Sequence, residues 1–124
     1  MAGWTSEELH KIEAADELQL ASARRDGSLR SPVTIWAVRH GDDLYVRSVN
    51  GRTASWFRGA QARHEGRIRA GGVDKDVRLV ETADSNHEID AAYRTKYHRY
   101  SPSIVASIVT PGARAATLKL VPRS

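Results

Sequence analysis

Short strand-like segments joined by tight-turn signals occupy most of this chain of 124 residues. Runs of alternating or continuous apolar residues predict strands at residues 18–23, 32–38, 44–49, 67–70, 77–80 and 117–121. Asp26-Gly27, Gly41-Asp42 and Gly71-Gly72 stand between neighbouring segments, and such pairs favour the tight turns of hairpins. Because strands and helices do not alternate along the chain, this order predicts an antiparallel sheet or small barrel with helices at its ends.

Two capping boxes indicate where helices begin. Thr5 is followed three residues later by Glu8, and we expect the helix that they begin to end near Asp16. Ser85 and Glu88 repeat this spacing in front of an amphipathic segment. Both helices therefore have a defined start and an apolar stripe that can pack on the sheet.

Glycine and proline indicate the limits of the other helices. Apolar residues recur at helical spacing from Trp56 to Arg63, and we expect Gly66 to end that helix. Ser101-Pro102 places a capping residue and a proline at the start of a short helix, which Pro111-Gly112 is expected to end. The predicted fold is mainly β, of the α+β class: a six-stranded antiparallel barrel with flanking helices.

The composition indicates one globular domain, with 40% hydrophobic and 27% charged residues. We expect a single domain over residues 1–124, with the helix of residues 1–16 packed on the barrel. The absence of cysteine excludes disulfides, thiolate metal sites and cysteine nucleophiles. No apolar run approaches the roughly 20 residues that span a bilayer, and the N-terminus lacks the pattern of a secretion signal. We therefore expect a soluble, cytoplasmic protein.

The formal charge of +4 comes with a strong preference for arginine over lysine, and the arginine fork suits phosphate and carboxylate groups. The arginines are spread from Arg24 to Arg123 rather than massed in the stripe typical of a nucleic-acid footprint. Nucleic acid is therefore the weakest of the partners considered.

The segment from Ser48 to Trp56 changes from an extended to a helical pattern and places anion-binding groups at that change. Free N–H groups at a helix start, a glycine that allows close approach, an arginine and two hydroxyls suit a phosphate. The residues of this candidate site are Ser48, Asn50, Gly51, Arg52, Thr53, Ser55 and Trp56. The alternative is that Thr53 only caps the helix and that Arg52 is solvated.

The order of the segments RRDGSLRSPVTIWAV, LYVRSVNGRTASWFRGAQAR, RIRAGG, VRLVETAD and KYHRY resembles the split β-barrel flavin-binding superfamily. The resemblance covers roughly residues 17–122 and is strongest to the branch of the deazaflavin-dependent nitroreductases, in a small group without an assigned function. It implies a split barrel, a coenzyme that is FMN or a deazaflavin, and a homodimer with the cofactor cleft between its subunits. A small-molecule substrate would complete such an oxidoreductase.

The resemblance also implies roles for individual residues. Arg30 and Ser31 would lie near the cofactor, and the segment from Ser48 to Trp56 would hold its phosphate side. Substrate contacts would come from Tyr97, His98 and Tyr100; the alternative is an aromatic helix end that packs on the barrel. Where many relatives have Arg-Asn-Leu after the tryptophan and an aromatic residue, this chain has Arg58-Gly59-Ala60, which leaves FMN and deazaflavin undistinguished.

The remaining chemistry leaves alternatives open. The flavin ring would perform the redox chemistry, so no catalytic side chain is assigned. Trp36 would form either a wall for that ring or part of the core. The five histidines show no metal-ligand spacing, so no metal site is expected. The alternative function is a non-catalytic small barrel that binds an anionic metabolite or a protein partner through an arginine-rich groove.

Overall fold

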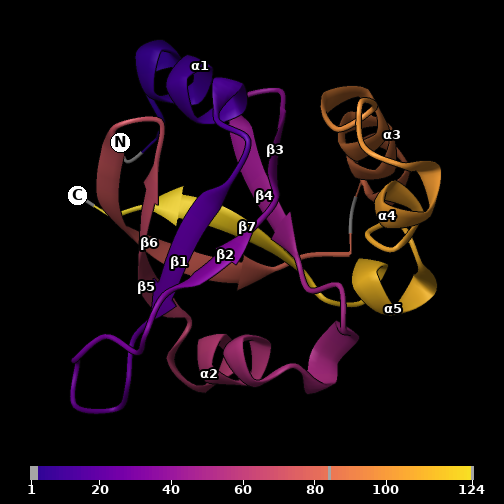
Figure 1. Cartoon of the computed structure of the whole chain (residues 1–124). Coiled ribbons are helices and arrows are strands. Elements are labelled where there is room, and N and C mark those ends of the chain that lie inside the picture. Colours follow the sequence, from indigo (N-terminus) through magenta and orange to yellow (C-terminus); the bar gives the residue numbers. More distant parts are fainter. Residues whose placement is uncertain (1–2, 84, 124) are drawn as a thin grey trace.

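The computed structural model describes residues 3–83 and 85–123. Seven strands form one antiparallel sheet in the order β2-β1-β5-β6-β7-β4-β3, which curls into a nearly closed barrel (Figure 1). The strands are β1 (Leu18–Ser22), β2 (Val33–Ile35), β3 (Ala37–His40), β4 (Asp43–Arg47), β5 (Glu65–Ala70), β6 (Val73–Glu81) and β7 (Thr117–Pro122). The predicted fold class is confirmed, with seven strands in place of six.

The extra strand arises at Trp36, where the strand predicted over residues 32–38 is divided into β2 and β3. β2 and β3 are the two edges of the sheet, although a single residue separates them in the chain. Side chains of α3 (Asn86–Lys96) bind the backbone at this break. Tyr93 donates to the carbonyl of Trp36 at 3.1 Å, and Lys96 Nζ donates to that of Ala37 at 2.7 Å. A helix far along the chain therefore provides hydrogen bonds to the carbonyl groups at this break, which the local pattern does not reveal.

Helices cover both ends and one side of the barrel (Figure 1). They are α1 (Ser6–Ala14), the 3₁₀ turn η1 (Gly51–Thr53), α2 (Ser55–Arg63), α3, α4 (Pro102–Ala106) and α5 (Pro111–Arg114). The first capping box is confirmed: Glu8 N donates to Thr5 Oγ1 at 3.1 Å, and Thr5 N donates to Glu8 Oε1 at 2.9 Å. Leu9 and Ile12 on α1 are buried in the barrel core.

The second capping box is wrong. Ser85 has a left-handed φ of 61° and makes no side-chain cap to α3. The expected end of the α4 helix at Pro111-Gly112 is wrong as well, because Pro111 begins α5. The hydroxyl of Thr110 accepts from Ala113 N at 3.1 Å there, and a proline fits the first turn of a helix, where its missing N–H costs nothing.

The expected end of α2 is also corrected. His64, with a φ of 60°, ends the helix, and Gly66 lies inside β5. A Cβ atom at Gly66 would stand 2.6 Å from the carbonyl oxygen of Ala21 on the paired strand β1. The glycine therefore serves close strand approach rather than helix termination.

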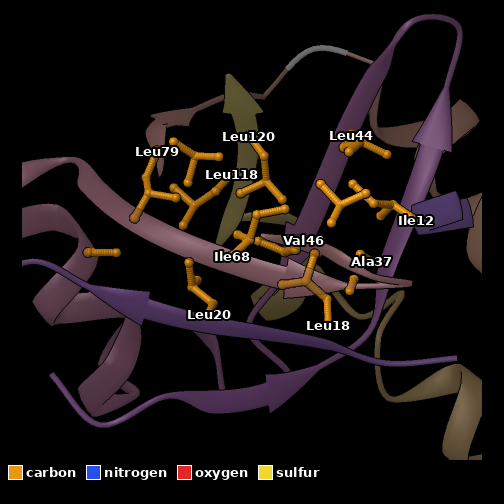
Figure 2. Packing of buried hydrophobic residues seen from close by; sticks show 14 of the residues in the cluster. Ile12, Leu18, Leu20, Ala37, Leu44, Val46, Ile68, Leu79, Leu118 and Leu120 are labelled. Atoms are coloured by element: carbon orange, nitrogen blue, oxygen red, sulfur yellow. The ribbon is translucent and has the colours of Figure 1, made fainter. Parts of the chain in front are cut away.

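The barrel core is mainly aliphatic, with Trp4 and Phe57 as its buried aromatic residues, and contains residues from β1, β3, β4, β5, β6 and β7 (Figure 2). The buried residues labelled in Figure 2 are Ile12, Leu18, Leu20, Ala37, Leu44, Val46, Ile68, Leu79, Leu118 and Leu120. A second cluster, which includes Val38, Ile89 and Tyr93, lies between the sheet and α3. Among the helices of the described residues, none combines the length and the apolar character needed to cross a bilayer.

Candidate functional site

A cleft of about 310 Å³ lies beside the break between β2 and β3, and we call it the tryptophan cleft. Four segments that are far apart in the sequence form it. They are β2 with Trp36, the end of β4 with the loop that follows, the first turn of α2, and α4 with the turn after it. It is lined by Val33, Thr34, Ile35, Trp36, Arg47, Ser48, Val49, Asn50, Trp56, Ile104, Ser107 and Ile108. Its volume is at the small end of ligand sites, which run from roughly 300 to 1,000 Å³.

Trp36 belongs to both the cleft and the interior. Its half-buried ring lines the cleft and lies flat on the buried ring of Tyr97, with centroids 3.9 Å apart and planes 3° apart. The ring of Tyr100 follows at 5.0 Å. Trp36 therefore packs on the interior and also lines the cleft, and its role as a wall for a flavin ring stays a prediction.

Ser48 has an unusual position in this cleft. The residue is 1% exposed, and its Oγ is the one buried side-chain polar atom of the described residues without a hydrogen-bond partner. A buried hydroxyl left unpaired costs about 1–3 kcal/mol. Because Ser48 lines the cleft, a ligand atom that reached its hydroxyl would satisfy this group. Two other predicted residues, Asn50 and Trp56, line the same cleft.

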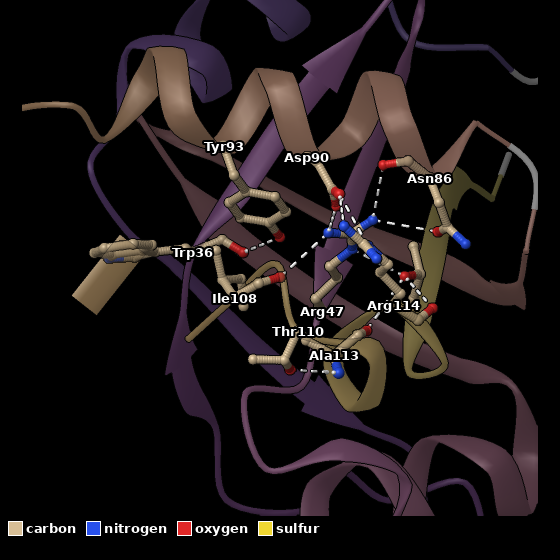
Figure 3. A network of polar contacts seen from close by, with 10 residues as sticks. Trp36, Arg47, Asn86, Asp90, Tyr93, Ile108, Thr110, Ala113 and Arg114 are labelled. Carbon is tan, nitrogen blue, oxygen red and sulfur yellow. Dashed lines mark hydrogen bonds and ion pairs between the residues drawn. The ribbon is translucent and has the colours of Figure 1, made fainter. Parts of the chain in front are cut away.

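Arg47, next to Ser48, is the centre of a buried network (Figure 3). Its guanidinium pairs with Asp90 on α3 and donates to Thr117 Oγ1 at 3.0 Å and to the Ile108 carbonyl at 3.2 Å. Arg114 Nη2 approaches the other oxygen of Asp90 to 2.6 Å. Burial alone would raise the pKa of the Asp90 carboxyl, but the two guanidiniums outweigh it and hold the pKa below its ordinary value. The network ties β4 to α3 and to the cleft wall at Ile108.

Arg52 lies outside the tryptophan cleft. Its guanidinium forms an ion pair with Glu81 at 2.7 Å and donates to the carbonyl of Ala115 at 2.8 Å. Gly51 has a positive φ of 76° and faces Gly112. Thr53 donates to the carbonyl of Asn50 at 3.4 Å and does not cap α2. A phosphate at this turn would have to compete with Glu81 for Arg52.

Two of the other predicted residues, Arg30 and Ser55, lie beside α2 together with Arg58 and Gly59, which were not predicted. Arg30, Ser55, Arg58 and Gly59 line an open groove of about 340 Å³, which we call the arginine groove. Within the described part of the chain, neither guanidinium of this groove has a hydrogen-bond or ion-pair partner. A Cβ at Gly59 would stand 2.8 Å from Arg30 Nε, so glycine makes room for that side chain. Ser31 is exposed and lines neither the groove nor the cleft.

The predicted substrate residues do not line the tryptophan cleft. Tyr97 is buried behind Trp36, and its hydroxyl donates to the carbonyl of Asp16 at 2.8 Å. His98 is exposed, with Nδ1 2.9 Å from the carbonyl of Thr95. His98 and the half-buried Tyr100 line a separate pocket of about 260 Å³ between α3 and α4. For Tyr97, the alternative of an aromatic helix end packed on the barrel describes the observed position.

Sequence reasoning missed several residues of the cleft and its support. These are the α4 wall, the Arg47–Asp90–Arg114 network and the free guanidinium of Arg58. The only available signal was a charged residue inside an apolar pattern: Arg47 follows Val46 in a strand, and Asp90 follows Ile89 on the buried stripe of α3. Such a signal identifies a buried charge but not its partner.

The comparisons with known proteins agree with this architecture. A family described as "Uncharacterized protein conserved in bacteria (DUF2255)" matches residues 8–120. The chain belongs to this family. No curated protein matches the sequence.

Solved structures place the family in a wider fold group. An FAD-binding protein from Mesorhizobium loti is 19% identical, with a TM-score of 0.58 over 98% of this chain and 91% of that one. An F420 reductase is 18% identical, with a TM-score of 0.56 over 92% and 90%. The heme storage protein HutZ from Vibrio cholerae is 16% identical, with a TM-score of 0.60 over 95% and 89%. This DUF2255 protein therefore shares the split-barrel fold of these solved structures.

Proposed function

We propose that this protein is a cytoplasmic oxidoreductase that binds a flavin-type coenzyme, FMN or a deazaflavin, with the coenzyme ring in the tryptophan cleft. The observation that supports this most is the unpaired hydroxyl of Ser48, buried in a cleft lined by two tryptophans and aliphatic side chains. A planar heteroaromatic ring offers the apolar faces that such a lining favours and a polar edge for Ser48. The coenzyme, when bound, supplies the redox chemistry.

Heme fits the same cleft less well, although structural neighbours of this chain include a heme storage protein. No histidine, cysteine or methionine is among the described residues that line the cleft, so no usual axial ligand faces it. The described residues also contain no group of three or more His, Cys, Asp or Glu side chains placed to hold a metal ion. A flavin-type ring needs no such ligand.

We place the phosphate in the arginine groove rather than at Arg52. Arg30 and Arg58 offer two guanidiniums that have no partner among the described residues, and Ser55 adds a hydroxyl at the first turn of α2. Trp56 lines the tryptophan cleft while its neighbour Ser55 lines the groove, so the start of α2 separates the two sites. A ring in the cleft and a phosphate in the groove would contact adjacent residues of one helix turn. Arg52 keeps its pairing with Glu81 in this arrangement.

A second copy of the chain would cover the mouth of the cleft. Val49 and Ile104 line the cleft and are 52% and 50% exposed, so the cleft has exposed aliphatic surface that a partner could cover. The homodimer implied by the resemblance would bury them and exclude water from the ring. Substrate would then enter at the subunit boundary.

The test is a titration of purified protein with FMN and with a phosphate-bearing 8-hydroxy-5-deazaflavin, followed by fluorescence quenching. Ser48→Ala removes the unpaired hydroxyl, so it should leave the unfolding free energy equal or raise it by up to about 1 kcal/mol, while it weakens coenzyme binding. Arg58→Gln should weaken binding by about 1.5–3 kcal/mol, the scale of a charged hydrogen bond. Arg52→Gln is the matched control and should change binding little.

Failure of both coenzymes to bind would reject the proposal. Inorganic phosphate that binds without any ring ligand would support the alternative of a non-catalytic barrel for an anionic metabolite. If Arg52→Gln weakened coenzyme binding more than Arg58→Gln, the proposed coenzyme would stand, but its phosphate would be assigned to Arg52.

A further inference from the structure

The tryptophan cleft is unbalanced in charge. Arg47 is the single charged residue among the described residues that line it, and no carboxylate is among them. Its guanidinium donates to the carbonyl of Ile108, which belongs to the cleft wall, at 3.2 Å. The charge of Arg47 therefore lies one hydrogen bond behind that wall.

The network behind the wall does not neutralise this charge. Two guanidiniums, those of Arg47 and Arg114, share the single carboxylate of Asp90. Asn86 and Thr117 complete the set, and both are neutral. Within the described part of the chain no second carboxylate pairs with either arginine, so the network has a net charge of one positive unit. The side chains of Arg47 and Asp90 are 0% and 3% exposed, so water screens their charges poorly, whereas that of Arg114 is 40% exposed and is partly screened.

We propose that the cleft prefers ligands whose ring bears a negative charge, and that Arg114 determines this preference. The inference rests on the proposed coenzyme site, and it adds the charge class of the ring to it. Without Arg114, Asp90 would pair with Arg47 alone, and the network would be neutral as seen from the cleft. With Arg114, the carboxylate is divided between two cations, and part of the charge of Arg47 remains to attract an anion.

An ionisable ring provides the test. The probe is 8-hydroxy-5-deazariboflavin, which lacks phosphate and therefore does not depend on the arginine groove. Its ring hydroxyl ionises with a change in visible absorbance, so one titration at several pH values gives the affinity of the neutral and anionic forms. The neutral analogue 5-deazariboflavin reports ring binding by itself. Thermal unfolding of each variant confirms that it is folded.

We expect the wild-type protein to bind the anion roughly three- to tenfold more tightly than the neutral form, the size of a partly desolvated charge interaction. Arg114→Gln should abolish the preference and leave 5-deazariboflavin affinity unchanged, and Arg114→Lys should restore it because the charge returns. Arg67→Gln is the control: that side chain is 41% exposed, like the 40% of Arg114, and pairs with Asp74 away from the cleft. It should leave the preference intact.

Equal affinity for the two ring forms in the wild-type protein would overturn this inference and leave the coenzyme proposal standing. An equal loss of anion and neutral-ring affinity in Arg114→Gln would also overturn it, because the arginine would then act only on structure. No binding of either ring would reject the proposed function, and the inference with it.

Discussion

The indole of Trp36 lies flat on the phenol ring of Tyr97, at the point where the barrel is split between β2 and β3. The hydroxyl of Tyr97 also donates to the carbonyl of Asp16, just before β1, and accepts from the N–H of Ala37, at the start of β3. One side chain, at the residue that caps the C-terminus of α3, thus orients a cleft residue through its ring and joins two strand ends through its hydroxyl.

These two contacts can be separated by substitution. Tyr97→Phe removes the hydroxyl and should lower the free energy of unfolding by about 1–2 kcal/mol, because Ala37 N loses a buried partner. Coenzyme affinity should stay unchanged, since the ring still supports Trp36. Tyr97→Leu should lower stability further and also weaken binding. Urea unfolding and ligand titration of both variants check this, and equal binding in both would show that the stacking does not position Trp36.

Lys96 gives the protein a stability that rises in alkaline solution. Burial lowers the pKa of its ammonium to about 8, against the opposing effect of Glu13 and Asp16. Between pH 8 and the ordinary value of 10.5, the unfolded chain therefore binds more protons at this site than the folded one, and folding is favoured as pH rises. The unfolding free energy of the wild type minus that of Lys96→Met should therefore increase with pH over this window. A difference independent of pH would contradict the burial of the ammonium.

Asp90 has a pH dependence of the same sign, but in the acid range. Its pKa is held below the ordinary 3.8 in the folded protein, so its contribution to stability is complete above that value and is lost as pH falls through the folded pKa. At neutral pH, Asp90→Asn should cost about 3 kcal/mol, because Arg47 is left buried and unpaired. Below pH 3.8 the unfolding free energies of the variant and the wild type should converge. A constant gap down to pH 2 would exclude Asp90 as the titrating group.

Substitution of Gly59 should weaken FMN binding more than it lowers the stability of the fold. An added Cβ would meet the side-chain atoms of Arg30 at 2.8 Å and Ser22 Oγ at 3.1 Å, and Arg30 is free to turn away. Gly59→Ala should therefore keep most of the stability but weaken the binding of FMN relative to riboflavin, which lacks the phosphate. Gly66→Ala is the contrast, because its Cβ would meet backbone at 2.6 Å and should destabilise the sheet. If Gly59→Ala bound FMN with the wild-type affinity, Arg30 would not belong to the phosphate site.

The local patterns predicted the elements whose cause is local. Thr5 and Glu8 form their capping box within four residues, and Gly27, Gly41 and Gly71 adopt the positive φ that their turns require. Ser48, Asn50 and Trp56 were predicted as one site because they are close in the chain, and they do line one cleft. Arg52 was grouped with them by the same proximity, yet its side chain is held by Glu81, 29 residues away.

The sequence by itself therefore determined the antiparallel barrel class and the turns, and it grouped Ser48, Asn50 and Trp56, because periodicity and turn chemistry act over a few residues. Only the tertiary structure decided where the barrel splits, which arginines stay unpaired and which charge lies behind the cleft. Those outcomes depend on partners far away in the chain, such as Asp90 for Arg47 and Asp16 for Tyr97, separated by 43 and 81 residues. A charged residue in an apolar strand indicates that a partner exists, but only the folded chain brings one carboxylate between two guanidiniums.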